Sequence, residues 1–102
     1  MSLANEQDPE TTYKVERDAG IYPVDKYFYK VTTFPEFSAD FSADKLSSSP
    51  YIYGWYSLET LPQWLQDAIR ALDVAGAGYG VNGLGKRVGD TYWISKVLTF
   101  TD

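Results

Sequence analysis

Residues 61–75 have the repeat of an amphipathic α-helix, and this segment constrains the fold more than any other. Apolar residues recur at the i, i+3, i+4, i+7 spacing of one helical face, and polar residues fill the other. The apolar face consists of Leu61, Trp64, Leu65, Ala68, Ile69 and Leu72, and the polar face of Gln63, Gln66, Asp67, Arg70 and Asp73. A helix with a single apolar stripe must lie against another apolar layer.

Both ends of this helix have sequence signals. Thr60 and Gln63 have the spacing of a capping box, which predicts Thr60 as the N-cap and Gln63 as the side chain that reaches back to it. Pro62 fits the first turn, where its missing N–H is harmless. Gly76 is suited to end the helix.

The rest of the chain supplies strands. Runs rich in aromatic and β-branched residues predict strands at 13–16, 26–34, 51–56, 81–88 and 91–99. In the second run, alternation places Tyr27, Tyr29, Val31 and Thr33 on one face and Phe28, Lys30, Thr32 and Phe34 on the other. Gly89 and Asp90 form a two-residue connection typical of a tight hairpin. Residues 36–50 are predicted to be a loop.

These elements predict an α+β fold, an antiparallel sheet of four to five strands with one amphipathic helix, about residues 61–75, packed on one face. A chain of 102 residues has room for one hydrophobic core. We expect residues 1–11 to be a disordered tail and residues 12–102 to be a single domain, because the first eleven residues show no apolar periodicity.

Composition excludes several classes of chemistry. The chain has no histidine and no cysteine, so catalytic triads, imidazole acid–base catalysis, thiolate nucleophiles and disulfides are impossible. No apolar stretch is long enough to span a membrane, and the first residues do not resemble a signal peptide. We therefore expect a cytoplasmic protein with no membrane partner.

The net charge of −5 is a weak indication of a basic partner. Three of the five excess negative charges, Glu6, Asp8 and Glu10, lie in the predicted tail. A DNA mimic would carry more organised acidity, and a nonspecific DNA binder needs the opposite sign. We expect no nucleic-acid partner.

The glycine-rich segment 76–85 contains two nucleotide-binding patterns in the wrong context. Residues 78–83 fit GxGxxG, but a helix precedes them and a strand follows, which reverses the order that a dinucleotide site requires. Residues 80–86 fit GxxxxGK, yet Arg87 stands where Ser or Thr would hold magnesium. We interpret the segment as a helix-to-strand loop and expect no cofactor.

The acidic residues give no metal motif. Glu36, Asp40 and Asp44 repeat every four residues but lack the pattern of a calcium loop, so we interpret them as part of a solvated loop. No catalytic constellation is predicted, and we expect a protein that is not an enzyme.

Aromatic residues are the strongest compositional signal, at 17% of the chain. They exceed what a core of this size hides, and tyrosine and tryptophan concentrate binding energy at protein interfaces. Arginine also concentrates binding energy at protein interfaces, so we include Arg70 and Arg87 among the predicted binding residues. The predicted partner-binding residues are Tyr51, Tyr53, Trp55, Tyr27, Tyr29, Arg70 and Arg87.

The leading hypothesis is a small non-enzymatic domain that binds a protein partner or itself through an aromatic-rich sheet face. The alternative is a small carboxylate-dependent enzyme or a carbohydrate- or ligand-binding domain that uses the aromatics as a stacking platform, with two of Glu59, Asp67, Asp73 and Asp90 as its polar groups. In size, acidity and absence of motifs the chain resembles the small accessory proteins of bacterial viruses, which implies the host cytoplasm as its location.

Overall fold

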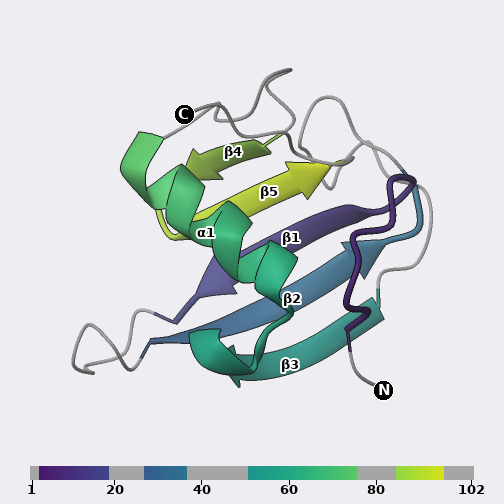
Figure 1. Ribbon diagram of the computed structural model, residues 1–102, viewed down its shortest axis with the longest axis horizontal. Helices are drawn as coiled ribbons and strands as arrows, with labels where there is room; N and C mark the ends of the chain where they lie inside the picture. The colour runs from purple at the N-terminus through teal and green to yellow at the C-terminus, as the bar shows by residue number, and fades with distance from the viewer. Residues whose placement is uncertain (1–2, 19–26, 37–50, 76–84, 96–102) are drawn as a thin grey trace.

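The computed structural model describes residues 3–18, 27–36, 51–75 and 85–95. They form a five-stranded antiparallel sheet with one α-helix across one face, as predicted (Figure 1). The elements are β1 (Thr12–Arg17), β2 (Phe28–Phe34), β3 (Tyr51–Ser57), a 3-10 turn η3 (Leu58–Thr60), α1 (Gln63–Ala75), β4 (Gly85–Val88) and β5 (Thr91–Ser95).

The first strand of the chain lies at the centre of the sheet. The strand order is β3-β2-β1-β5-β4, so β1 pairs with β2 on one side and with the last strand, β5, on the other. Val15 illustrates the register, since it lies between Val31 of β2 and Tyr92 of β5. The edge strands are β3 and β4, and α1 lies between them in the sequence (Figure 1).

The core lies between α1 and the face of the sheet that it covers. Leu65, Ile69 and Leu72 from the helix are fully buried, as are Val15 and Val31 from the central strands. The remaining members of the cluster are Tyr13, Tyr29, Leu61, Ala68, Tyr92 and Ile94. The apolar stripe of the helix was therefore predicted correctly, and its burial is the main stabilising contribution.

The start of the helix differs from the prediction. The helix begins at Gln63 rather than Leu61, and the capping box does not form. Thr60 ends the 3-10 turn instead, and its Oγ1 donates a hydrogen bond to the Ser57 carbonyl. The Gln63 side chain donates forward to Asp67. Thr60, which the pattern assigned to the helix cap, therefore belongs to a short turn between β3 and α1.

Gln66 was placed on the exposed helical face, and this placement is wrong. Its side chain is buried, and its Nε2 donates to the Leu61 carbonyl at 2.8 Å. The hydrogen bond satisfies a polar group that burial would otherwise destabilise. It also holds the residues before the helix against its first turn.

The two faces of β2 are as predicted. Tyr29 and Val31 join the core under the helix, so Phe28, Lys30, Thr32 and Phe34 belong to the opposite face. We name this side of the sheet, which α1 does not cover, the far face. It is buried near Phe34 and Ser95 but exposed at Phe28.

The hairpin between β4 and β5 forms at the predicted turn, where Gly89 has φ +61. The described parts of these strands are shorter than the predicted runs, because residues 81–84 and 96–99 lie outside the described residues. The predicted loop beyond Glu36, the terminator Gly76 and residues 78–84 of the glycine patterns also lie outside them.

The N-terminal segment contacts the folded domain within the residues described. Leu3 packs against the core cluster, and the Trp64 indole Nε1 donates to the Ala4 carbonyl at 3.1 Å. The Asp8 N–H donates to the hydroxyl of Tyr13 at 2.9 Å. Residues 3–8 are therefore connected to both the helix and the central strand.

Replacing Leu65 with alanine tests the role of the helix stripe. Leu65 is fully buried, so we expect the L65A variant to lose about 2–5 kcal/mol of unfolding free energy through lost transfer energy and a cavity. Urea denaturation followed by circular dichroism measures it. Arg70→Ala, at an exposed position of the same helix, is the matched control and should change stability by less than about 0.5 kcal/mol. Equal losses in both variants would contradict this account of the core.

Candidate binding surface

Exposed apolar side chains gather at one edge of the sheet. Three of the large exposed residues belong to β3, namely Tyr51 at 46% exposure, Ile52 at 56% and Trp55 at 53%. Phe28, at 37%, lies on the neighbouring strand. We name these four residues the β3 patch. Val88, at 55% exposure, lies on the other edge strand, β4.

Strand register places three members of the patch on the far face. Ile52 pairs with Thr32 and Trp55 pairs with Lys30, and both partners point away from the helix. Phe28 pairs with Ser57, so it is a diagonal neighbour of Trp55. Tyr51 pairs with Thr33 and projects on the helix side of β3. The patch therefore covers both sides of the edge strand.

The shape of β3 is set by a bulge next to Gly54. The register with β2 shifts between Val31 and Thr32, and Gly54 has φ +98, a conformation that favours glycine. The shift allows Ile52 and Trp55, three positions apart, to share the far face. Without it, strict alternation would place them on opposite faces.

Charged side chains border the patch on the far face. Lys30 lies beside Trp55 in the ladder, and Glu16 lies beside Lys30. Further along the sheet, Lys14 Nζ lies 5.4 Å from the ring centroid of Trp93. An apolar patch with a polar border is the usual anatomy of a protein interface.

The structure places some predicted binding residues on the surface and others beneath it. Tyr51, Tyr53 and Trp55 lie together on β3, with the rings of Tyr51 and Tyr53 4.6 Å apart in edge-to-face contact. Tyr53 is half-buried against the core. Tyr29 is buried under the helix with 4% of its surface exposed.

The other three predicted residues lie away from β3. Tyr27 packs against the core, with the Arg17 guanidinium 4.8 Å from its ring centroid. Arg70 is exposed on α1. Arg87 lies on β4, at the opposite edge of the sheet, and contacts Asp73. Of the predicted residues, the structure therefore brings Tyr51 and Tyr53 into contact, with Trp55 on the other face of the same strand.

Two members of the patch, Phe28 and Ile52, were not among the predicted residues. Phe28 shares its face with Lys30, and this alternation was the available signal for exposure. Ile52 lies between Tyr51 and Tyr53 in the sequence, and the prediction selected the two tyrosines because it was based on aromatic residues. Its exposure depends on β3 being an edge strand, which the sequence does not reveal.

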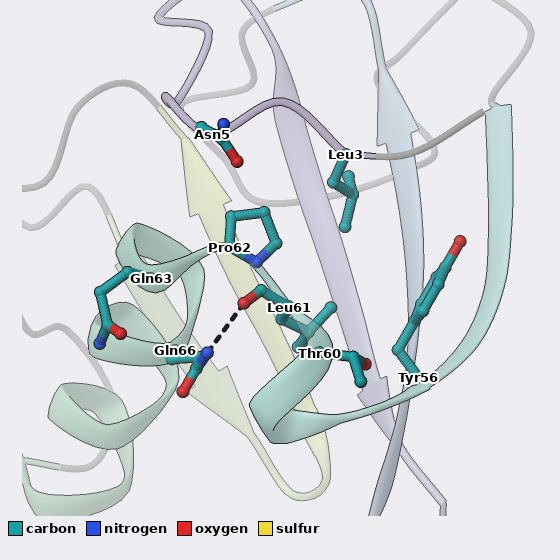
Figure 2. Close-up of a pocket in the computed structure, with 8 residues that line it drawn as sticks. All are labelled: Leu3, Asn5, Tyr56, Thr60, Leu61, Pro62, Gln63 and Gln66. Carbon is teal, nitrogen blue, oxygen red and sulfur yellow. Dashed lines mark hydrogen bonds between the residues drawn. The ribbon is translucent and has the colours of Figure 1, made fainter.

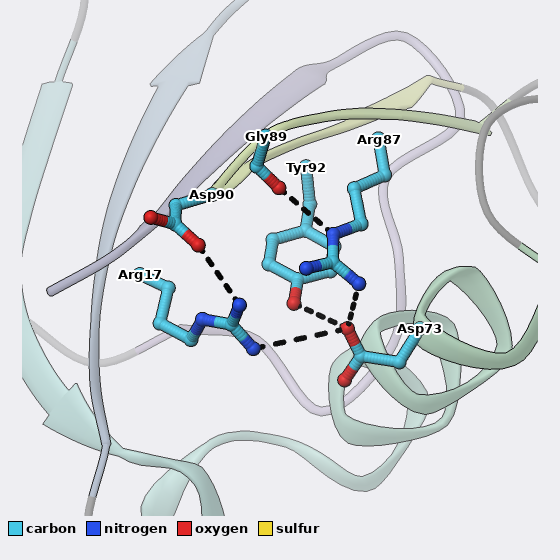
Figure 3. A network of polar contacts seen from close by, with 6 residues as sticks. All are labelled: Arg17, Asp73, Arg87, Gly89, Asp90 and Tyr92. Carbon is cyan, nitrogen blue, oxygen red and sulfur yellow. Dashed lines mark hydrogen bonds and ion pairs between the residues drawn. The ribbon is translucent and has the colours of Figure 1, made fainter. Parts of the chain in front are cut away.

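A polar network joins the helix to three strands (Figure 3). Asp73 Oδ1 accepts hydrogen bonds from Arg87 Nη1 at 2.8 Å and from the Tyr92 hydroxyl at 2.5 Å, and Arg17 Nη1 lies 4.0 Å away. Arg17 Nη2 also donates to Asp90 Oδ1 at 2.8 Å. Two arginines thus balance two aspartates.

Burial and this network shift the ionisation of buried tyrosines. Burial raises the pKa of Tyr92, and the hydrogen bond to Asp73 and its negative charge raise it further. Burial also raises the pKa of Tyr29. For Arg17, partial burial lowers the pKa, but the hydrogen bond to Asp90 and nearby negative charge outweigh it and the net shift is upward.

The network bears on the carboxylate-dependent alternative. Asp73 and Asp90 do converge, but on the guanidinium of Arg17, and neither Trp55 nor Trp93 is part of the network. Asp67 accepts a hydrogen bond from Gln63. Within the described residues, no group of three or more His, Cys, Asp or Glu could hold a metal ion. The arrangement suits structural ion pairing better than acid–base chemistry.

Two hollows lie along the N-terminal segment. The larger, of about 380 Å³, lies between Leu3 and Asn5 on one side and Tyr56, Thr60 and Pro62 on the other (Figure 2). Its lining has no charged side chain, and Gln66 in its wall already donates to the Leu61 carbonyl. The smaller, of about 150 Å³, contains Asp8 as its charged residue.

Comparisons with known proteins give no family. No protein-family model matches the chain, no curated protein matches it, and no solved structure matches it. Among the described residues, no helix has the length and apolar character needed to cross a membrane.

Tyr92→Phe tests the polar network through its pH dependence. Above pH 10, tyrosines of the unfolded chain lose protons that native Tyr92 retains, so stability decreases as pH rises. We expect Y92F to lose about 1.5–3 kcal/mol near neutral pH, the cost of a hydrogen bond to a charged group. The difference in unfolding free energy between Y92F and the wild type should decrease as the pH rises above about 10, because the wild type loses stability there and phenylalanine cannot ionise.

Urea denaturation at several pH values measures this difference. Tyr51→Phe, which removes the hydroxyl of an exposed side chain, is the matched control. A Y92F deficit that stays constant across the alkaline range would contradict the assigned role of Tyr92.

Proposed function

We propose that this chain is a protein-binding domain that uses the β3 patch. The observation that carries the proposal is the concentration of exposed Tyr51, Ile52 and Trp55 on a single edge strand, with Phe28 beside them. Contiguous exposed apolar side chains with a polar border are typical of interaction sites. Tryptophan and tyrosine are also the residues most enriched among those that dominate binding energy.

The arrangement of the rest of the domain supports a scaffold role. The helix and the covered face form a closed core, and the arginines near the helix are paired with aspartates. A packed core beneath a sheet restrains the backbone of its strands, which reduces the backbone entropy lost on binding. The β3 patch therefore presents preorganised contact groups.

A capture experiment tests the proposal. We immobilise the wild-type chain and, separately, an Ile52→Ser, Trp55→Ser double variant. Each is incubated with an extract of the cells in which the protein is expressed, and the bound proteins are identified by mass spectrometry. We expect the double variant to lose at least about 1.4 kcal/mol of binding free energy, a tenfold loss of affinity.

Val88→Ser is the matched control, because Val88 is as exposed as Ile52 and Trp55 but lies on the other edge strand. It should retain the captured partner. Circular dichroism and urea midpoints establish that all variants are folded. Capture that is unchanged in the double variant, or a wild type that binds neither another protein nor a second copy of itself, would overturn the proposal.

A further inference from the structure

The outer edge of β3 offers backbone hydrogen-bonding groups. The Asp18 N–H donates to the Phe28 carbonyl, so Phe28 directs its backbone groups toward β1. Because these groups alternate along an antiparallel strand, Tyr29 and Val31 direct theirs toward β3. Their partners Tyr56 and Gly54 direct their backbone groups toward β2 in return. The backbone N–H and C=O groups of Ile52 and Trp55 therefore point toward the outer edge of the sheet. Within the described residues no strand pairs with this edge.

The two edges of the sheet differ in the features that normally prevent edge pairing. β4 has four residues, including Lys86 and Arg87, and short, basic edge strands resist pairing. β3 has seven residues, with no charge and no proline. It is also the strand with the most exposed apolar side chains. By these criteria β3 is open to another strand and β4 is protected.

We propose that a second copy of this chain pairs with β3 in antiparallel orientation, forming a twofold dimer with a continuous ten-stranded sheet. The inference rests on the proposed function, since it names the partner of the same patch. A twofold axis between Tyr53 and Gly54 places Ile52 of each copy opposite Trp55 of the other. Both side chains lie on the far face, so each covers an exposed apolar group of the other copy.

The chemistry of the edge favours this occupant. Because β3 carries no charged side chain, it has no charge that would attract an oppositely charged peptide. Two copies of this neutral strand can also pair without charge repulsion between them, although the whole chain has a net charge of −5. A twofold contact buries both β3 edges at once and closes the assembly. A head-to-tail contact would instead have to use the protected β4 edge.

Light scattering coupled to size exclusion, with analytical ultracentrifugation over a concentration series, tests the dimer. We expect the wild type at twice the chain mass. Ile52→Lys and Trp55→Lys should each raise the dimer dissociation constant at least about tenfold, because lysine on an edge strand opposes pairing. Val88→Lys, at an equally exposed site on β4, should leave the dimer unchanged. A monomeric wild type at all concentrations overturns the inference.

Amide hydrogen exchange on the wild-type chain tests the geometry independently of any variant. The N–H groups of Ile52 and Trp55 should exchange at least about tenfold more slowly at concentrations where the dimer forms. The N–H of Tyr56, already within the β2–β3 ladder, should be protected at every concentration. A dimer in which Ile52 and Trp55 remain unprotected overturns edge pairing.

The capture experiment separates failure of the dimer from failure of the proposed function. A monomer that captures another protein through Ile52 and Trp55 overturns the dimer and keeps the function. A monomer that captures nothing overturns both.

Discussion

Burial of the helix stripe against the central strands is the interaction on which the rest of the structure depends. Leu65, Ile69 and Leu72 meet Val15 and Val31 from β1 and β2, and all five are fully buried. Without this contact the helix would expose an apolar face to water, and the covered face of the sheet would do the same.

The polar network supplements this core where the helix ends. Asp73 joins the helix to Arg87 of β4 and Tyr92 of β5, and Arg17 links it to the hairpin turn at Asp90. These groups are partly screened from water, so their pairing matters more than that of fully exposed ions. Through these ion pairs the network connects the helix to β1, β4 and the hairpin turn.

The exposure of the β3 patch is a consequence of sheet order. Completion of the core leaves β3 at one edge and β4 at the other, and the helix covers only one face. Apolar residues that would be buried in a central strand are exposed on β3. The same residues supply both the side-chain contacts and the free backbone edge on which the proposed interactions depend.

Local sequence patterns were sufficient to predict most of the individual elements. The period of 3.6 in residues 61–75 predicted the helix and its apolar stripe, and the period of two in residues 26–34 predicted the strand and the membership of its two faces, because periodicity records which residues share one side of an element. Gly89 and Asp90 likewise marked the hairpin. The capping box failed because Thr60 and Gln63 found other partners, Ser57 and Asp67, whose proximity the motif does not encode.

The exposure of individual strand residues follows from strand pairing across the sheet, which local patterns did not predict. Tyr29 and Trp55 are both aromatic strand residues, yet one is buried and the other half exposed, because Tyr29 lies under the helix on the interior strand β2 and Trp55 lies on the far face of the edge strand β3. The bulge at Gly54 placed Ile52 and Trp55 on the same face, which alternation alone would not predict. Strand order and register arise from contacts between residues that are distant in the sequence, and local sequence patterns do not encode these contacts.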